Sequence, residues 1–98
     1  MTEIDARRTY IEAARAHGAA TNAGDSDSAN LAHDLLIQAL EKLRRCPDRG
    51  RDILLGLLVD EDLHVRCWAA THLLPIAEEE AVRALSELSS RSGIAAFN

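Results

Sequence analysis

The chain has 98 residues and a formal net charge of −5, and 47% of its residues are apolar although only 3% are aromatic. This length supports one domain with a modest core, and a core without aromatics must be built from Leu, Ile, Val and Ala, which suits closely packed helices. The acidic balance argues against a dedicated nucleic-acid binder, because Lys and Arg supply most phosphate contacts.

No run of alternating β-branched residues occurs anywhere in the sequence, so we expect an all-α fold. The first half of the chain predicts two helices. A helix over about 3–21 begins with Thr2 and Asp5 as a capping box, and its Ala-rich end, 16–23, indicates a frayed terminus. A second helix is expected over about 26–45. Its apolar arc is Leu31, Leu35, Leu36, Ala39, Leu40 and Leu43, and its polar stripe is Asn30, Asp34, Gln38, Glu41 and Arg45.

A third helix is expected over about 48–59, and its segment 53–58 has so little polar surface that we expect it to be covered on more than one side. Pro47 ends the helix before it, and Asp48 can cap it. Gly56 costs about 1 kcal/mol relative to Ala in a helix, which suggests that a neighbouring helix approaches closely there.

The stretch 60–75 organises the second half of the chain. Acidic residues form a short turn before a fourth helix, in which Val65, Ala69 and Leu73 recur at i, i+4 and i+8. An apolar helix, a tight turn and a helix packed back on the first make a helical hairpin. A fifth helix is expected over about 78–90.

Several of these residues resemble a HEAT-type repeat, which has an apolar first helix, an acidic turn, a Val-Arg pair and small packing residues. The residues that carry the resemblance are the segment 57–62, Val65-Arg66, Ala69-Ala70 and Leu73. More closely, Gly24-Asp25 with Ala29-Asn30, followed by 64–75, is similar to a family of small bacterial HEAT-like proteins of unknown function.

The resemblance implies a HEAT-like α-α superhelix of about five helices, two antiparallel pairs plus one, in a single domain over 1–98. A further helix would be expected after Phe97, and its absence would leave the fifth helix unpartnered. An uncovered repeat end invites self-association. The resemblance also implies that Arg66 pairs with Asp60 or Asp62 to order the turn.

Helix geometry argues against a metal site that uses both His64 and His72 of the fourth helix, and a site with His64 and Cys67 would need further ligands from elsewhere. His64 and His72 lie about 12 Å apart along a helix, whereas zinc bonds are about 2 Å long. We therefore expect no metal and no cofactor. Cys46 lies near several arginines, which could lower the pKa of its thiol, but no base is placed beside it.

These observations favour a non-enzymatic protein-binding helical module with no catalytic residues. The N-terminus has no signal core and no apolar run is long enough to span a bilayer, so we expect a cytoplasmic protein that does not bind membranes or nucleic acid. The candidate partner-binding residues are Asn30, Asp34, Gln38 and Glu41 on the second helix and His64, Trp68, Thr71 and His72 on the fourth.

Three functions stay open. The first is binding of a protein partner, and the acidic balance is compatible with a basic one. By family analogy the chain would be an immunity or accessory protein for a bacterial toxin. The second is structural self-assembly, with a homodimer formed through the apolar C-terminal edge. The third is a small metal- or thiol-dependent enzyme that uses Cys67 and the histidines.

Overall fold

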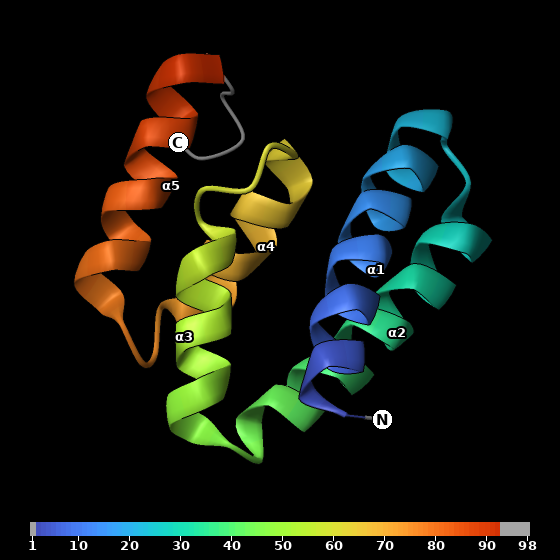
Figure 1. Cartoon of the computed structure of the whole chain (residues 1–98). Helices are drawn as coiled ribbons and strands as arrows, with labels where there is room; N and C mark the ends of the chain where they lie inside the picture. Colours follow the sequence, from blue (N-terminus) through green and yellow to red (C-terminus); the bar gives the residue numbers. More distant parts are fainter. Residues whose placement is uncertain (1, 93–98) are drawn as a thin grey trace. The chain divides into compact units, whose positions relative to one another are not determined.

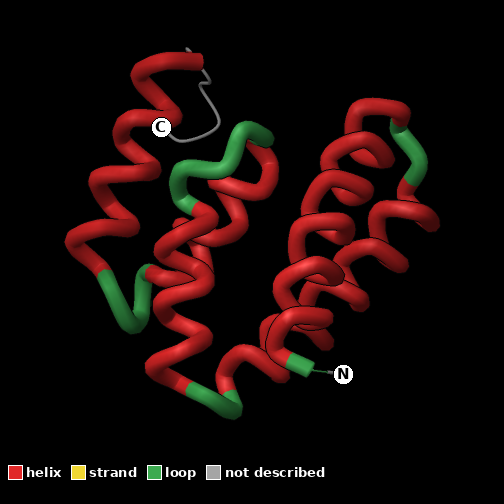
Figure 2. The backbone as a smooth tube through the Cα atoms, viewed as in Figure 1, coloured by secondary structure: helices red, strands yellow, loops and turns green. Residues whose placement is uncertain are grey.

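The structure, a computed structural model, describes residues 2–92, which form five α-helices and no strand (Figures 1 and 2). The all-α prediction is confirmed, and the HEAT-like superhelix stays a prediction. The chain divides into two compact units, Met1–Gly50 and Arg51–Asn98. The helices are α1 (Glu3–Ala23), α2 (Ser26–Arg44), α3 (Pro47–Leu57), α4 (Leu63–Leu73) and α5 (Glu78–Ser92).

In the first unit, α1 and α2 pack side by side as an antiparallel pair (Figure 1). The predicted capping box at the start of α1 is confirmed, since Thr2 and Asp5 exchange hydrogen bonds. The predicted frayed end of α1 is wrong. Gly24 adopts a left-handed conformation with φ 71°, and the Asp25 amide donates to the Ala20 carbonyl at 2.9 Å. This is a firm Schellman stop, which glycine adopts without steric cost.

Fewer apolar residues enter the core between α1 and α2 than the sequence predicts. On α1 the buried residues are small except for Tyr10, which is fully buried. On α2 the predicted apolar arc is wrong at two positions, because Leu31 is 67% exposed and Leu35 is 48% exposed. Successive helical residues differ by about 100°, so these leucines point away from the buried stripe. That stripe consists of Ala32, Leu36, Ala39, Leu40 and Leu43.

The first turns of α3 contact the end of α2 through Gly50. A Cβ atom at this position would overlap the carbonyl oxygen of Leu43 and lie 2.8 Å from its carbonyl carbon. Arg49 forms an ion pair with Glu3 at 2.7 Å and so joins this corner to the start of α1. Pro47 is the first residue of α3, where its missing N–H is not needed. Asp48 therefore lies inside the first turn, and the prediction that it caps this helix is wrong.

The second unit contains the predicted motif, but with a different helix pairing. Val65, Ala69 and Leu73 are fully buried, as predicted. However, α4 makes its extensive contacts with α5 and not with α3. The expectation that the fifth helix lacks a partner is therefore wrong. The further helix expected after Phe97 concerns positions outside the described residues.

The apolar helix α3 is less enclosed than predicted. Leu54 and Leu57 are buried, whereas Ile53 and Leu55 are half-buried. Gly56 is exposed, and a Cβ atom there would meet no atom within 4 Å. The predicted close approach of a helix at Gly56 is wrong; the close approach occurs at Gly50.

Candidate protein-binding surface

One side of α2 presents the predicted polar residues to solvent together with two leucines. We call this surface the α2 face. The polar residues Asn30, Asp34, Gln38 and Glu41 are all exposed. Leu31 and Leu35 lie along the margin of this polar row. Sequence reasoning missed these leucines as surface residues, although each lies only one position from a residue of the polar stripe. The α2 face comprises Asn30, Leu31, Asp34, Leu35, Gln38 and Glu41.

Local interactions at both ends of α2 hold this face in place. At the start, the Asp25 carboxylate accepts hydrogen bonds from the Ser28 hydroxyl at 2.7 Å and the Ser28 amide at 3.1 Å. These bonds lower the pKa of Asp25, because they stabilise its charged form. At the other end, the Gly50 backbone lies so close to Leu43 that an added Cβ atom would overlap the Leu43 carbonyl oxygen. The helix that carries the face is thus capped at its start and closely packed at its end.

The chemistry of the α2 face is acidic and apolar. Asp34 and Glu41 are exposed, and Asp27 adds a further exposed carboxylate in the first turn of the helix. Carboxylates attract Lys and Arg side chains, and exposed leucines gain free energy when a partner covers them. This surface can bind a protein that offers both kinds of group.

The second predicted surface, on α4, is less open. We call His64, Trp68, Thr71 and His72 the α4 edge. His64 and Thr71 are exposed, but Trp68 and His72 are half-buried and stack on each other with ring centroids 5.4 Å apart. The Thr71 hydroxyl donates to the Cys67 carbonyl at 2.8 Å. Three of the four side chains therefore interact within their own helix.

The acidic turn before α4 acts as a helix cap. The Asp62 carboxylate accepts hydrogen bonds from the His64 amide at 2.9 Å and the Val65 amide at 3.1 Å. Asp60 in turn accepts a hydrogen bond from the Asp62 amide at 3.0 Å. The Nε atom of Arg66 is buried and has no hydrogen-bond partner. The ion pair between Arg66 and the turn acids stays a prediction.

The two cysteines have raised thiol pKa values. A hydrogen bond to the Glu3 carboxylate raises the pKa of Cys46, and partial burial and the charge of Glu3 add to this effect. The expectation that neighbouring arginines lower the pKa of Cys46 is wrong, because Glu3 outweighs them. Burial raises the pKa of Cys67. Both shifts favour the less nucleophilic thiol form.

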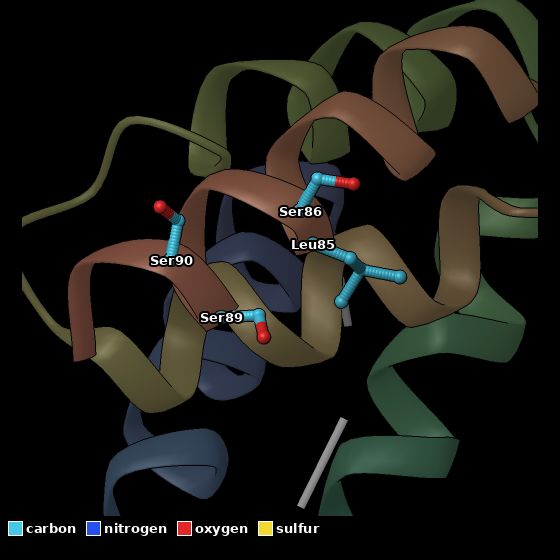
Figure 3. A pocket seen from close by; sticks show the side chains of 4 residues that line it. All are labelled: Leu85, Ser86, Ser89 and Ser90. Carbon is cyan, nitrogen blue, oxygen red and sulfur yellow. The ribbon is translucent and has the colours of Figure 1, made fainter. Parts of the chain in front are cut away.

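Two shallow pockets lie on the second unit. The larger, of about 410 Å³, follows α5 and is lined by Leu85, Ser86, Ser89 and Ser90 (Figure 3). The smaller, of about 280 Å³, is lined by Arg66 and Glu87 together with apolar residues of α3, α5 and the turn after α3. Neither joins a nucleophile to a base. Sequence reasoning did not single out the serines, whose i, i+3 and i+4 spacing places them on one side of α5.

Across residues 2–92, no group of three or more His, Cys, Asp or Glu side chains is arranged to hold a metal ion. None of the described helices is both long and apolar enough to cross a bilayer. The chain matches no known family model, no curated protein and no solved structure.

Proposed function

We propose that the chain is a non-enzymatic protein-binding helical module and that the α2 face is the surface that binds its partner. The observation that carries this proposal is the exposure of Leu31 and Leu35 beside an acidic stripe on an otherwise well-capped helix. Isolated apolar residues on a surface are ordinary. Two leucines one helical turn apart, in a row with Asp34, form a compact mixed patch of the kind that a partner can cover.

The chemistry of the face specifies the partner in outline. Burial of apolar area contributes about 25 cal/mol per Å², so the leucines can supply affinity. Carboxylates at the rim contribute mainly to association rate and orientation. The partner is therefore a protein with a basic and partly apolar surface.

A narrower form of the proposal is an immunity or accessory protein that neutralises a bacterial toxin. It is supported by the resemblance of 64–75 to small bacterial HEAT-like proteins and by the acidic charge of −5. An acidic inhibitor suits a toxin whose working surface is basic.

Self-assembly is a second candidate, because the second unit exposes three apolar residues around the connection between α4 and α5. Leu74 is 37% exposed, Ile76 is 53% exposed and Val82 is 47% exposed. The homodimer expected through the apolar C-terminal edge stays a prediction. Light scattering over a concentration range tests this candidate, and a monomer at all concentrations contradicts it.

The proposed function is tested by site-specific photo-cross-linking in cells, with the photoreactive residue at position 38 of the α2 face. We expect one main cross-linked protein. After identification and purification, that protein should bind the wild-type chain and bind the Asp34→Lys/Glu41→Lys variant at least tenfold more weakly.

A control variant carries the same change of charge elsewhere. Glu12 on α1 and Glu79 on α5 are exposed and lie outside the α2 face. The Glu12→Lys/Glu79→Lys variant should bind the partner within about twofold of the wild type. Equal weakening by both variants, or no cross-link at position 38, would contradict the proposal.

A further inference from the structure

The exposed residues of α2 follow a heptad pattern. Leu31 and Leu35 are four residues apart, and Asp27, Asp34 and Glu41 recur at intervals of seven. All five are exposed. If Leu31 occupies position d and Leu35 the following position a, the three acids all occupy position g. In coiled coils, a and d form the apolar seam, whereas g carries the charge that selects the partner.

The pattern is continuous along the helix. Asp27 and Glu41 are fourteen residues apart, which is about 21 Å at 1.5 Å per residue. The remaining seam positions are Ser28, Gln38 and Lys42, so the seam is apolar only at its two central leucines. Such a seam is short and polar at its ends, which suits a reversible partner better than a permanent one.

Only one flank of the seam is charged. The e positions on the other flank are Ala32 and Ala39, and both are buried in the core of the first unit. A helix that docks on Leu31 and Leu35 therefore meets a row of carboxylates on one side alone. This arrangement fixes where the basic residues of the docked helix must lie.

We infer that the α2 face binds one basic amphipathic helix of the partner protein. The apolar stripe of that helix covers Leu31 and Leu35, and a row of Lys or Arg residues along its edge pairs with Asp27, Asp34 and Glu41. This inference rests on the proposed function and specifies the structural element that the partner presents. Helix-on-helix docking through i and i+4 anchors is a common mode of peptide recognition.

A second copy of the chain fits the face poorly. In an antiparallel pair of α2 faces, the acidic rows would lie opposite each other and repel. In a parallel pair, each acidic row would lie beside the flank of Ala32 and Ala39, which offers no opposite charge. The net charge of −5 on each copy adds to the repulsion.

The test uses a synthetic three-heptad peptide with Leu at positions a and d and Lys at positions e and g. Its own lysines prevent strong self-association. A matched peptide carries Glu in place of Lys. Binding to the full chain is measured by fluorescence anisotropy at low and at high ionic strength.

We expect the Lys peptide to bind at least tenfold more tightly than the Glu peptide, with affinity that falls as salt rises. The Asp34→Lys/Glu41→Lys and Leu31→Ser/Leu35→Ser variants should each weaken binding of the Lys peptide about tenfold. The Glu12→Lys/Glu79→Lys control should bind it within about twofold, and circular dichroism should show that every variant keeps its helicity.

Besides failure of the Lys peptide to bind, three results would overturn the inference. One is an equal loss of affinity for the Lys peptide in the Glu12→Lys/Glu79→Lys control and in the Asp34→Lys/Glu41→Lys variant. That result would indicate unspecific charge attraction. Another is unchanged binding of the Lys peptide by the Leu31→Ser/Leu35→Ser variant. The third is a wild-type dimer in light scattering that Leu31→Ser/Leu35→Ser abolishes, which would make a second copy the occupant. If the peptide fails while position 38 still cross-links a partner, the docked element is not a helix and the proposed function stands.

Discussion

The α2 face and the α4 edge are both rows of residues along one side of a helix, yet the structure uses them differently. On α2, Leu31 and Leu35 reach solvent beside exposed acids. On α4, Trp68 is half-buried and stacks on His72. Periodicity alone therefore does not separate a binding surface from a packing surface. The two kinds of surface differ in the fraction of each side chain that remains exposed to solvent after the helix has packed.

This difference predicts distinct roles for the two rows. Residues of the α2 face should contribute to binding and little to folding, because they bury little area in the free protein. Trp68 should contribute to the stability of the fold, because its ring already packs on His72 in the free protein.

The largest effect is expected at the contact that fixes the end of α2. Gly50→Ala places a Cβ atom against the carbonyl group of Leu43, and overpacking against backbone should lower the free energy of unfolding by about 3 kcal/mol. Urea denaturation measures the change. Gly56→Ala, in the same helix but in open space, is the matched control and should raise stability by up to about 1 kcal/mol. Similar effects at both glycines would contradict the packing described for α3.

The second prediction concerns the α4 edge. Trp68→Ala removes a half-buried ring and its stack on His72, and should lower the free energy of unfolding by about 2 kcal/mol, less than for a fully buried Trp. Denaturant titration followed by circular dichroism measures the change, since Trp68 is the only tryptophan. Unchanged stability would place Trp68 with the exposed residues and remove the contrast with α2.

The third prediction concerns the acid sensitivity of the cap on α2. The folded pKa of Asp25 lies below its unfolded value, so the cap stabilises the fold at neutral pH and this contribution is lost as pH falls through the folded pKa. Asp25→Asn keeps a good N-cap but removes the titration. Its melting temperature should therefore fall less than that of the wild type as the pH drops below about 4.

Glu3 and Asp5 also have lowered pKa values, through the Cys46 thiol and through Thr2 respectively. The Asn variant should therefore reduce the acid sensitivity without abolishing it. Identical pH profiles for wild type and Asp25→Asn would show that the Asp25 cap does not contribute.

The smallest effect is expected on the α2 face itself. Leu31 is 67% exposed, so Leu31→Ala should change the free energy of unfolding by no more than about 0.5 kcal/mol. Leu36→Ala, on the buried side of the same helix, should cost about 3 kcal/mol. A large loss for Leu31→Ala would mean that this residue packs in the core and is not available to a partner.

The sequence predicted the helices and the capping box of α1 because these depend on local chemistry. Thr2 with Asp5, and Asp62 before α4, show the short-range spacing that helix starts require. The spacing of Val65, Ala69 and Leu73 likewise identified one buried side of α4. The prediction of a polar stripe on α2 is also confirmed, since Asn30, Asp34, Gln38 and Glu41 are all exposed.

Pairing and burial could not be predicted in the same way, because they depend on which helices meet. Leu31 and Leu36 are the same residue type on one helix, yet only Leu36 is buried. The two glycines of α3 look alike in sequence, but only Gly50 lies against another segment of backbone. The α5 helix was expected to lack a partner and instead packs on α4. Each of these facts belongs to tertiary contacts that periodicity does not encode.

The central claim, that the α2 face binds a basic partner, is tested most directly by comparing the two rows against the protein that cross-links at position 38. Its Kd is measured for the wild type, for Asp34→Lys/Glu41→Lys and for Thr71→Lys, which places a charge on the exposed part of the α4 edge. We predict an affinity loss of at least tenfold for the α2 variant and less than twofold for the α4 variant. The opposite order would show that the partner binds at α4 and would contradict the account.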